Sequence, residues 1–345
     1  MLAVRRLSVR RFLVMGWRTI LRSSAWALVV YLAYVGLGLE WLAVPFLPLT
    51  TIGIAVSFYV GFKNNSAYER FWEGRKIWGA VVNESRSWAN GVLAYVRPGD
   101  DDAEARELRR SLIYRHVAWI NALRVQLRRK SRFFDNPAPA TKRRLENHAE
   151  HMRNDWEKEI GPFLDRDEYE QISATINPAT HLVKQQGQVL AREWREGALD
   201  KFHQIDLMAI LRELYTLQGK CERIKNTPFP RQYAEFGGLF VQVFVGLVPF
   251  GLLDVFSDRL QHVQSATFAP TDLLWLVPYL GSAALIHYVF ISMERIGDAS
   301  EDPFERSFND VPMNALCRTI ERDLRQMLGE DEVPPGETAI DGILY

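Results

Sequence analysis

The sequence lacks the features by which several classes of protein are recognised. It has only two cysteines among 345 residues, Cys221 and Cys317, and neither lies in a CxxC pattern. This argues against a disulfide framework and against a zinc site. Basic and acidic residues number 42 each, so the chain has no basic excess of the kind that nucleic-acid-binding proteins carry. No GxGxxG, P-loop, HExxH or GxSxG motif occurs, and we therefore expect neither an enzyme nor a cofactor.

What the sequence does have is long apolar stretches near both ends, with a charged block between them. Four stretches, at residues 24–44, 50–62, 236–256 and 271–293, predict transmembrane helices. Six arginines precede the first stretch and several basic residues follow the second, so the positive-inside rule predicts that both termini are cytoplasmic.

The predicted organisation has six parts. In chain order they are an interfacial helix (1–23), the first and second transmembrane helices (24–62), a cytoplasmic helical domain (63–235), the third and fourth transmembrane helices (236–293), a cytoplasmic C-terminal helical segment (294–328) and a disordered tail (329–345).

The stretch 48–78 predicts one long helix that begins in the membrane and leaves it at about Gly61–Lys63. Ile54, Phe58 and Phe62 are spaced four apart and form one stripe on it. Small residues between them would let other helices approach closely. Periodicity alone favours an ordinary role in the core of a helical bundle, and the alternative is a helix that lines a symmetric assembly.

Three sequence blocks bear on this choice. The segment GFKNNSAYERFWEGRKIWG resembles the signature of the bestrophin family in its bacterial branch, and CERIKNTPFPRQYA and EDPFERSFNDVPMNALCRTIERDL match two further family segments in the expected order. The resemblance implies an all-α fold in which four transmembrane helices and a large cytoplasmic helical domain assemble as a homopentameric channel around one central pore. It also implies a multi-pass location in the bacterial inner membrane, with membrane lipids and permeating monovalent ions as partners.

The resemblance also implies which residues line the pore. Ile54, Phe58 and Phe62 match the family's neck, where apolar rings can gate by dewetting, and Ile205 matches its cytoplasmic aperture. Glu69 and Glu73 could equally form intersubunit salt bridges with Arg70, which is the interpretation that we favour. The candidate polar residues at the pore mouths are Thr50, Thr51, Ser66, Glu69, Glu73 and Asp206.

The acidic segment GDASEDPFERSFND resembles the segment that binds Ca²⁺ in animal members of the family. Here Pro303 and Phe304 interrupt it and leave Glu301, Asp302 and Glu305, so we expect neither a metal site nor calcium regulation. We expect these carboxylates to bond to backbone N–H groups and arginines instead.

The ion preference has two open readings. The residues Glu40, Glu69, Glu73 and Asp206 favour monovalent cations such as sodium, whereas Lys63 favours anions. We lean to cations, with a chloride channel of the same architecture as the alternative and a membrane-anchored binding or scaffold protein as a more distant one. Whether His203 or His287 faces the pore stays open.

Overall fold

The structure is a computed structural model, and it describes residues 1, 3, 9–99, 103–129, 150–260, 270–304 and 309–345. These residues are helical or irregular, apart from one isolated β-bridge between Ile340 and Ile343. The chain forms two compact units. We call Val4–Glu69 with Phe229–Glu301 the apolar unit, and Met1–Ala3 with Arg70–Pro228 and Asp302–Tyr345 the polar unit.

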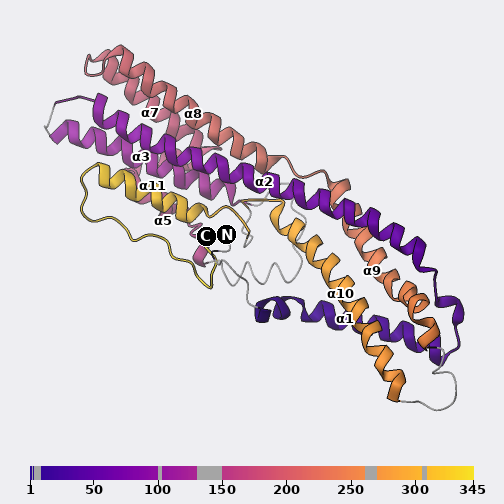
Figure 1. Cartoon of the computed structure of the whole chain (residues 1–345). Coiled ribbons are helices and arrows are strands. Elements are labelled where there is room, and N and C mark those ends of the chain that lie inside the picture. The colour runs from indigo at the N-terminus through magenta and orange to yellow at the C-terminus, as the bar shows by residue number, and fades with distance from the viewer. Residues whose placement is uncertain (2, 4–8, 100–102, 130–149, 261–269, 305–308) are drawn as a thin grey trace. The chain divides into compact units, whose positions relative to one another are not determined.

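The apolar unit contains the predicted transmembrane helices (Figure 1). They are α1 (Val9–Gly36), the first part of α2 (Phe46–Tyr95), α9 (Arg231–Leu260) and α10 (Pro270–Ser300). Each is long and apolar enough to cross a membrane. Hydrogen bonds from side-chain hydroxyls to backbone carbonyls connect these helices. The Tyr279 hydroxyl donates to the carbonyls of Ala27 and Pro249, and the Ser23 hydroxyl donates to that of Ala283.

The bounds of the first span differ from the prediction. The backbone of α1 is one helix from Val9, with no break at residues 23–24, and it ends at Gly36 rather than at residue 44. Gly38 has a φ of 65°, a conformation that glycine adopts without strain, and a 3₁₀ turn, η1 (Glu40–Leu42), follows. Pro48 lies in the first turn of α2, where its missing N–H has no helical partner to lose.

The polar unit contains the rest of α2 and shorter helices that pack on it. Asp155, Asp165, Asn177 and Asp200 each begin a helix by accepting a hydrogen bond from its first turn. The further elements are α3 (Ala103–Leu127), η2 (Glu150–Met152), α5 (Trp156–Ile160), η3 (Gly161–Phe163), α6 (Arg166–Ser173), α7 (Pro178–Arg195), α8 (Lys201–Asn226) and α11 (Met313–Met327). Trp78, Trp88 and Trp119 are fully buried in their shared core.

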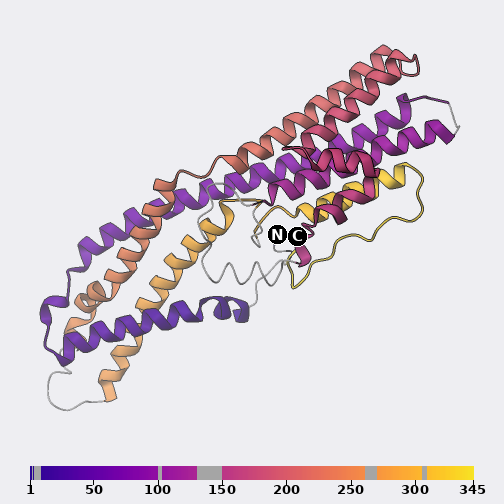
Figure 2. The ribbon, with the colours of Figure 1, turned by 180° about the vertical axis from the view of Figure 1, so that it is seen from behind.

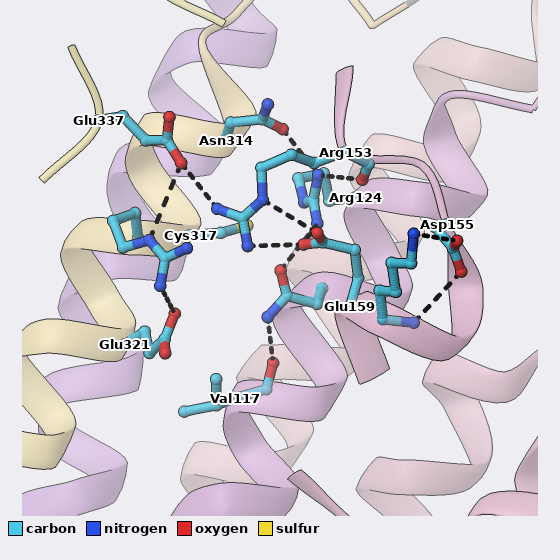
Figure 3. A network of polar contacts seen from close by, with 12 residues as sticks. Val117, Arg124, Arg153, Asp155, Glu159, Asn314, Cys317, Glu321 and Glu337 are labelled. Carbon is cyan, nitrogen blue, oxygen red and sulfur yellow. Dashed lines mark hydrogen bonds and ion pairs between the residues drawn. The ribbon is translucent and has the colours of Figure 1, made fainter. Parts of the chain in front are cut away.

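A polar network joins α3, α5 and α11 inside this unit. Figure 3 shows Arg124, which is buried, donating to Glu159 at 2.6 Å and to the side-chain oxygen of Asn314 at 2.7 Å. Arg153 bonds to Glu159 and extends the network to Glu337 in the C-terminal segment at 2.7 Å. Charge-assisted bonds of this kind offset the cost of removing the guanidinium groups from water.

The C-terminal segment 329–345 differs from the expectation of disorder. Glu330 accepts hydrogen bonds from Arg325 and from the Tyr114 hydroxyl, both at 2.6 Å. The Leu344 N–H donates to the Met1 carbonyl at 2.8 Å, so the two chain ends lie together (Figures 1 and 2). The acidic composition that suggested disorder instead supplies partners for arginines of the polar unit.

Candidate ion-conduction site

Within the apolar unit, α2 has one face packed and one face open. Positions three and four apart recur on the packed face because an α-helix has about 3.6 residues per turn. The packed residues are Leu49, Gly53, Val56, Val60, Lys63 and Ala67. Phe58 lies nine residues from both Leu49 and Ala67. At about 100° per residue, Phe58 therefore points about 180° away from the packed face.

The predicted neck residues lie on the open face. In the single chain Ile54 is 67% exposed, Phe58 is 80% exposed and Phe62 is 51% exposed. Phe62 contacts the ring of Tyr233 at a centroid distance of 5.9 Å, whereas Ile54 and Phe58 extend away from the chain. Periodicity alone favoured a role for these three side chains in the core of a helical bundle. Their exposure shows that they do not belong to the core of their own chain.

The small residues of α2 divide between the two faces. A Cβ atom at Gly53 would lie 2.8 Å from the Phe244 ring of α9, so glycine permits the close approach of these two helices. Gly61 and Ala55 are exposed, and a Cβ atom at Gly61 would meet no atom within 4 Å. The unfilled space beside the stripe leaves room for the helix of another copy.

Three of the polar residues predicted at the two ends of the stripe, Thr50, Thr51 and Glu69, have hydrogen-bond partners within their own chain. Thr50 and Thr51 are exposed, and their hydroxyls donate to the carbonyls of Phe46 and Leu47. Beyond the stripe, Glu69 is exposed and accepts a hydrogen bond from Asn65, while Ser66 is half-buried.

Two of the three residues interpreted as intersubunit salt bridges, Arg70 and Glu73, have charged partners within the chain. Glu73 pairs with Arg223 of α8 at 2.5 Å. Arg70 donates to the Ile224 carbonyl at 3.1 Å and lies 3.6 Å from Asp302. Both charged groups are engaged inside the chain because α8 and the segment after α10 bring complementary groups to α2.

Lys63 also differs from its predicted role as a positive charge near the pore. Its side chain is 3% exposed, and its ammonium lies 2.6 Å from Glu294 and 2.5 Å from Asp298 of α10. A buried ammonium needs such partners to offset its loss of hydration. Sequence reasoning missed both carboxylates, although their spacing of four residues at the end of an apolar stretch was a usable signal.

The proposed aperture lies in the polar unit, in the first turns of α8. Ile205 and Asp206 are exposed there, whereas Leu207 and Leu211 face the core. The ring of His203 stacks on Tyr95 at a centroid distance of 4.2 Å and an interplanar angle of 3°. That contact accounts for the orientation of His203.

The acidic segment after α10 is only partly described. Asp302 lies beside Arg70, as expected for a carboxylate with an arginine partner, and Glu301 is buried. Glu305 lies outside the described residues. Where the structure describes the chain, no group of three or more His, Cys, Asp or Glu side chains has the arrangement of a metal site. His287 is half-buried on α10.

The four apolar helices and the helical polar unit agree with the architecture that the resemblance implies. A sequence model of the family described as bacterial and fungal bestrophin protein matches residues 14–326. The chain belongs to the bestrophin family. Its four apolar helices, each long enough to cross a membrane, make it an integral membrane protein.

Curated relatives of this bestrophin carry a functional name. The voltage-dependent anion channel-forming protein YneE of Escherichia coli K12 is 29% identical over 301 residues, which cover 87% of this chain and 82% of that protein. A similarly named protein of Mesorhizobium japonicum, mll4386, is 28% identical over 84% of this chain and 76% of its own length.

The fold of this bestrophin is also found in a solved structure. A bacterial bestrophin homologue from Klebsiella pneumoniae has a TM-score of 0.71 and 24% identity, and the match covers 91% of this chain and 98% of that one. The all-α architecture predicted from the sequence is thereby confirmed.

Proposed function

We propose that this bestrophin is a homopentameric channel that conducts monovalent anions across the bacterial inner membrane, with both termini in the cytoplasm. Equivalent α2 helices surround one axis, and Ile54, Phe58 and Phe62 form three apolar rings that control the passage of hydrated ions. Ile205 contributes a second, cytoplasmic constriction.

The main support for this channel geometry is the exposed apolar stripe of α2, formed by Ile54, Phe58 and Phe62. Large apolar side chains are costly to expose to water, and a cluster of them signals a surface that something else covers or a pore that dewets. The opposite face of α2 already packs on its own unit, so the stripe is free to face a symmetry axis. The exposed small residues Ala55 and Gly61 suit contact with the neighbouring α2.

The preference for anions is a revision of the expectation from sequence. It is supported by the names of the curated relatives, which describe voltage-dependent anion channel-forming proteins at 28–29% identity over more than four fifths of the chain. Apolar rings discriminate little by charge. We therefore give the names of the relatives more weight than the carboxylates of Glu40, Glu69, Glu73 and Asp206, which favoured cations. Lys63 favours neither anions nor cations, because Glu294 and Asp298 compensate its charge.

The reversal potential across a planar bilayer tests the selectivity. In a tenfold KCl gradient, an anion-selective pore makes the concentrated side positive, by up to about 59 mV for a monovalent ion. A negative concentrated side would overturn the anion proposal in favour of a cation channel. That second candidate rests on the exposed carboxylate of Glu69 and on the Thr50 and Thr51 hydroxyls, whose protons are directed into the helix.

The same recordings test the neck. Ile54→Ala, Phe58→Ala and Phe62→Ala should each raise the current, because a smaller ring weakens dewetting. Leu285→Ala, on an exposed position of α10, is the matched control and should leave the current unchanged. If the three neck variants conduct the same current as the Leu285→Ala control, the proposal that these residues form a neck is rejected. A purified protein without ion flux in liposomes would favour the scaffold reading, and a particle mass other than five chains would reject the pentamer.

A further inference from the structure

Among the described residues of the apolar unit, three arginines pair with no carboxylate. Arg18 and Arg22 lie on the exposed face of α1, and Arg295 is exposed on α10. Among the residues that the structure describes, no carboxylate pairs with any of the three, whereas arginines such as Arg97 and Arg124 pair closely with glutamates. We propose that Arg18, Arg22 and Arg295 bind the phosphate of an anionic phospholipid headgroup.

The three arginines lie on two helices, α1 and α10, that pack together. Arg18 and Arg22 are four residues apart, so they are neighbours on one face of α1, with Cβ atoms about 6 Å apart. Thr19 lies between them in the sequence and is buried toward α10. Its hydroxyl accepts a hydrogen bond from Nη1 of Arg295 at 3.2 Å. This bond holds the Arg295 guanidinium against α1 at Thr19, which follows Arg18 directly in the sequence.

The nearby acidic groups of α10 are already engaged. Glu294 and Asp298 flank Arg295 in the sequence, and both lie within 2.6 Å of the Lys63 ammonium. Their negative charge is directed to α2 rather than to the arginines. Three like charges without a counter-ion repel one another, so a bound anion would relieve the repulsion. Phosphate suits the site because guanidinium groups donate to its oxygens in pairs.

The surroundings favour a lipid over a soluble phosphate. An exposed apolar stripe starts beside the arginines and continues along α1 through Trp17, Leu21, Ala25, Leu28 and Leu32. Fifteen residues of helix span about 22 Å, and one leaflet of the hydrocarbon core is about 15 Å thick. An acyl chain can therefore follow the stripe while its headgroup remains at the arginines. The Arg18 guanidinium also lies 5.4 Å from the Trp17 ring centroid, as expected near a membrane interface.

Native mass spectrometry of the full-length protein in detergent, titrated with phosphatidylglycerol, tests the site. Each of R18Q, R22Q and R295Q should weaken binding about fivefold, since each removes one basic group from an anionic lipid. Thr19→Val keeps the charge and the side-chain shape but removes the acceptor for Arg295, so it should also weaken binding. R166Q, at an exposed arginine of α6 that pairs with Glu170, is the control and should bind as the unchanged protein does.

Two competitors distinguish the source of the phosphate. Glycerol 3-phosphate, which has no acyl chains, should fail to displace phosphatidylglycerol, and phosphatidylcholine should bind more weakly than phosphatidylglycerol. Unchanged binding in the three arginine variants would overturn the proposal, and so would an equal loss in R166Q. Full displacement by glycerol 3-phosphate would point to a soluble ligand and would also overturn it. None of these outcomes depends on the ion selectivity or on the neck.

Discussion

Two aromatic side chains of α2, one in each unit, differ in exposure. In the polar unit Trp88 is fully buried among α2, α3 and their neighbours, while in the apolar unit Phe58 is 80% exposed on the same helix. Burying a large aromatic ring stabilises a chain by about 2–3 kcal/mol, so a fold that leaves one open in the single subunit forgoes that gain. At these two positions the polar unit buries its ring within its own chain, whereas the apolar unit leaves its ring open to whatever lies beyond the single chain.

The largest expected effect comes from removing a ring of the completed core. Trp88→Ala should lower the free energy of unfolding by about 3–5 kcal/mol, because a cavity forms where packing is complete. The measurement is the midpoint of thermal unfolding of the full chain in detergent. Trp194→Ala, at an exposed tryptophan of α7, should shift that midpoint little. Similar shifts in the two variants would mean that the polar unit has no rigid core at Trp88.

The next effect concerns the one buried charge on the packed face of α2. Lys63→Met leaves Glu294 buried without its ammonium partner and should destabilise the protein by about 3 kcal/mol. Adding Glu294→Gln to Lys63→Met should recover part of the loss, since the unpaired negative charge is then gone. A double variant as unstable as the single one would show that the ion pair does not join α2 to α10.

A smaller effect concerns the pH dependence of the polar unit. Burial lowers the pKa of His116 to about 3, and its Nε2 lies 2.8 Å from the Ser85 hydroxyl of α2. The histidine is neutral when folded but binds a proton below about pH 6.5 when unfolded, so its contribution to stability is lost as the pH falls. Between pH 7 and pH 5 the loss should be about 2 kcal/mol.

The control for this pH dependence is His116→Gln, which cannot titrate. Denaturant unfolding at both pH values should give a smaller drop for the variant than for the unchanged protein. Equal drops would mean that His116 is accessible to protons in the folded state.

The smallest effect on stability belongs to the open stripe. Phe58→Ala should change the unfolding midpoint by an amount that corresponds to less than about 1 kcal/mol, because substitutions at exposed sites rarely cost more. The same variant should raise the ion current. A loss as large as that of Trp88→Ala would mean that Phe58 is packed in the assembled protein rather than lining a path.

Much of this arrangement could be predicted from the sequence because it depends on local patterns. The four-residue spacing of Ile54, Phe58 and Phe62 was enough to predict one helical stripe, and the apolar stretches were enough to predict four membrane-crossing helices. The partners of Lys63 and Arg70 could not be predicted in this way, because Glu294 and Asp302 are more than two hundred residues away in the chain.

The C-terminal tail illustrates the same limit. Its acidic composition is typical of disorder, yet Glu330 and Glu337 have arginine partners that only the tertiary fold brings near. The ion preference depends on the field along an assembled pore, which the pattern of a single chain does not contain.

Cysteine modification tests most directly whether the open face of α2 lines the ion path. Burial raises the pKa of the Cys317 thiol to about 11, and burial also raises the pKa of the Cys221 thiol, so neither native cysteine should react. A charged, water-soluble thiol reagent should therefore change the current of Phe58→Cys channels and leave Leu285→Cys channels unaffected. An unchanged current in Phe58→Cys, or an equal change in both variants, would contradict the account.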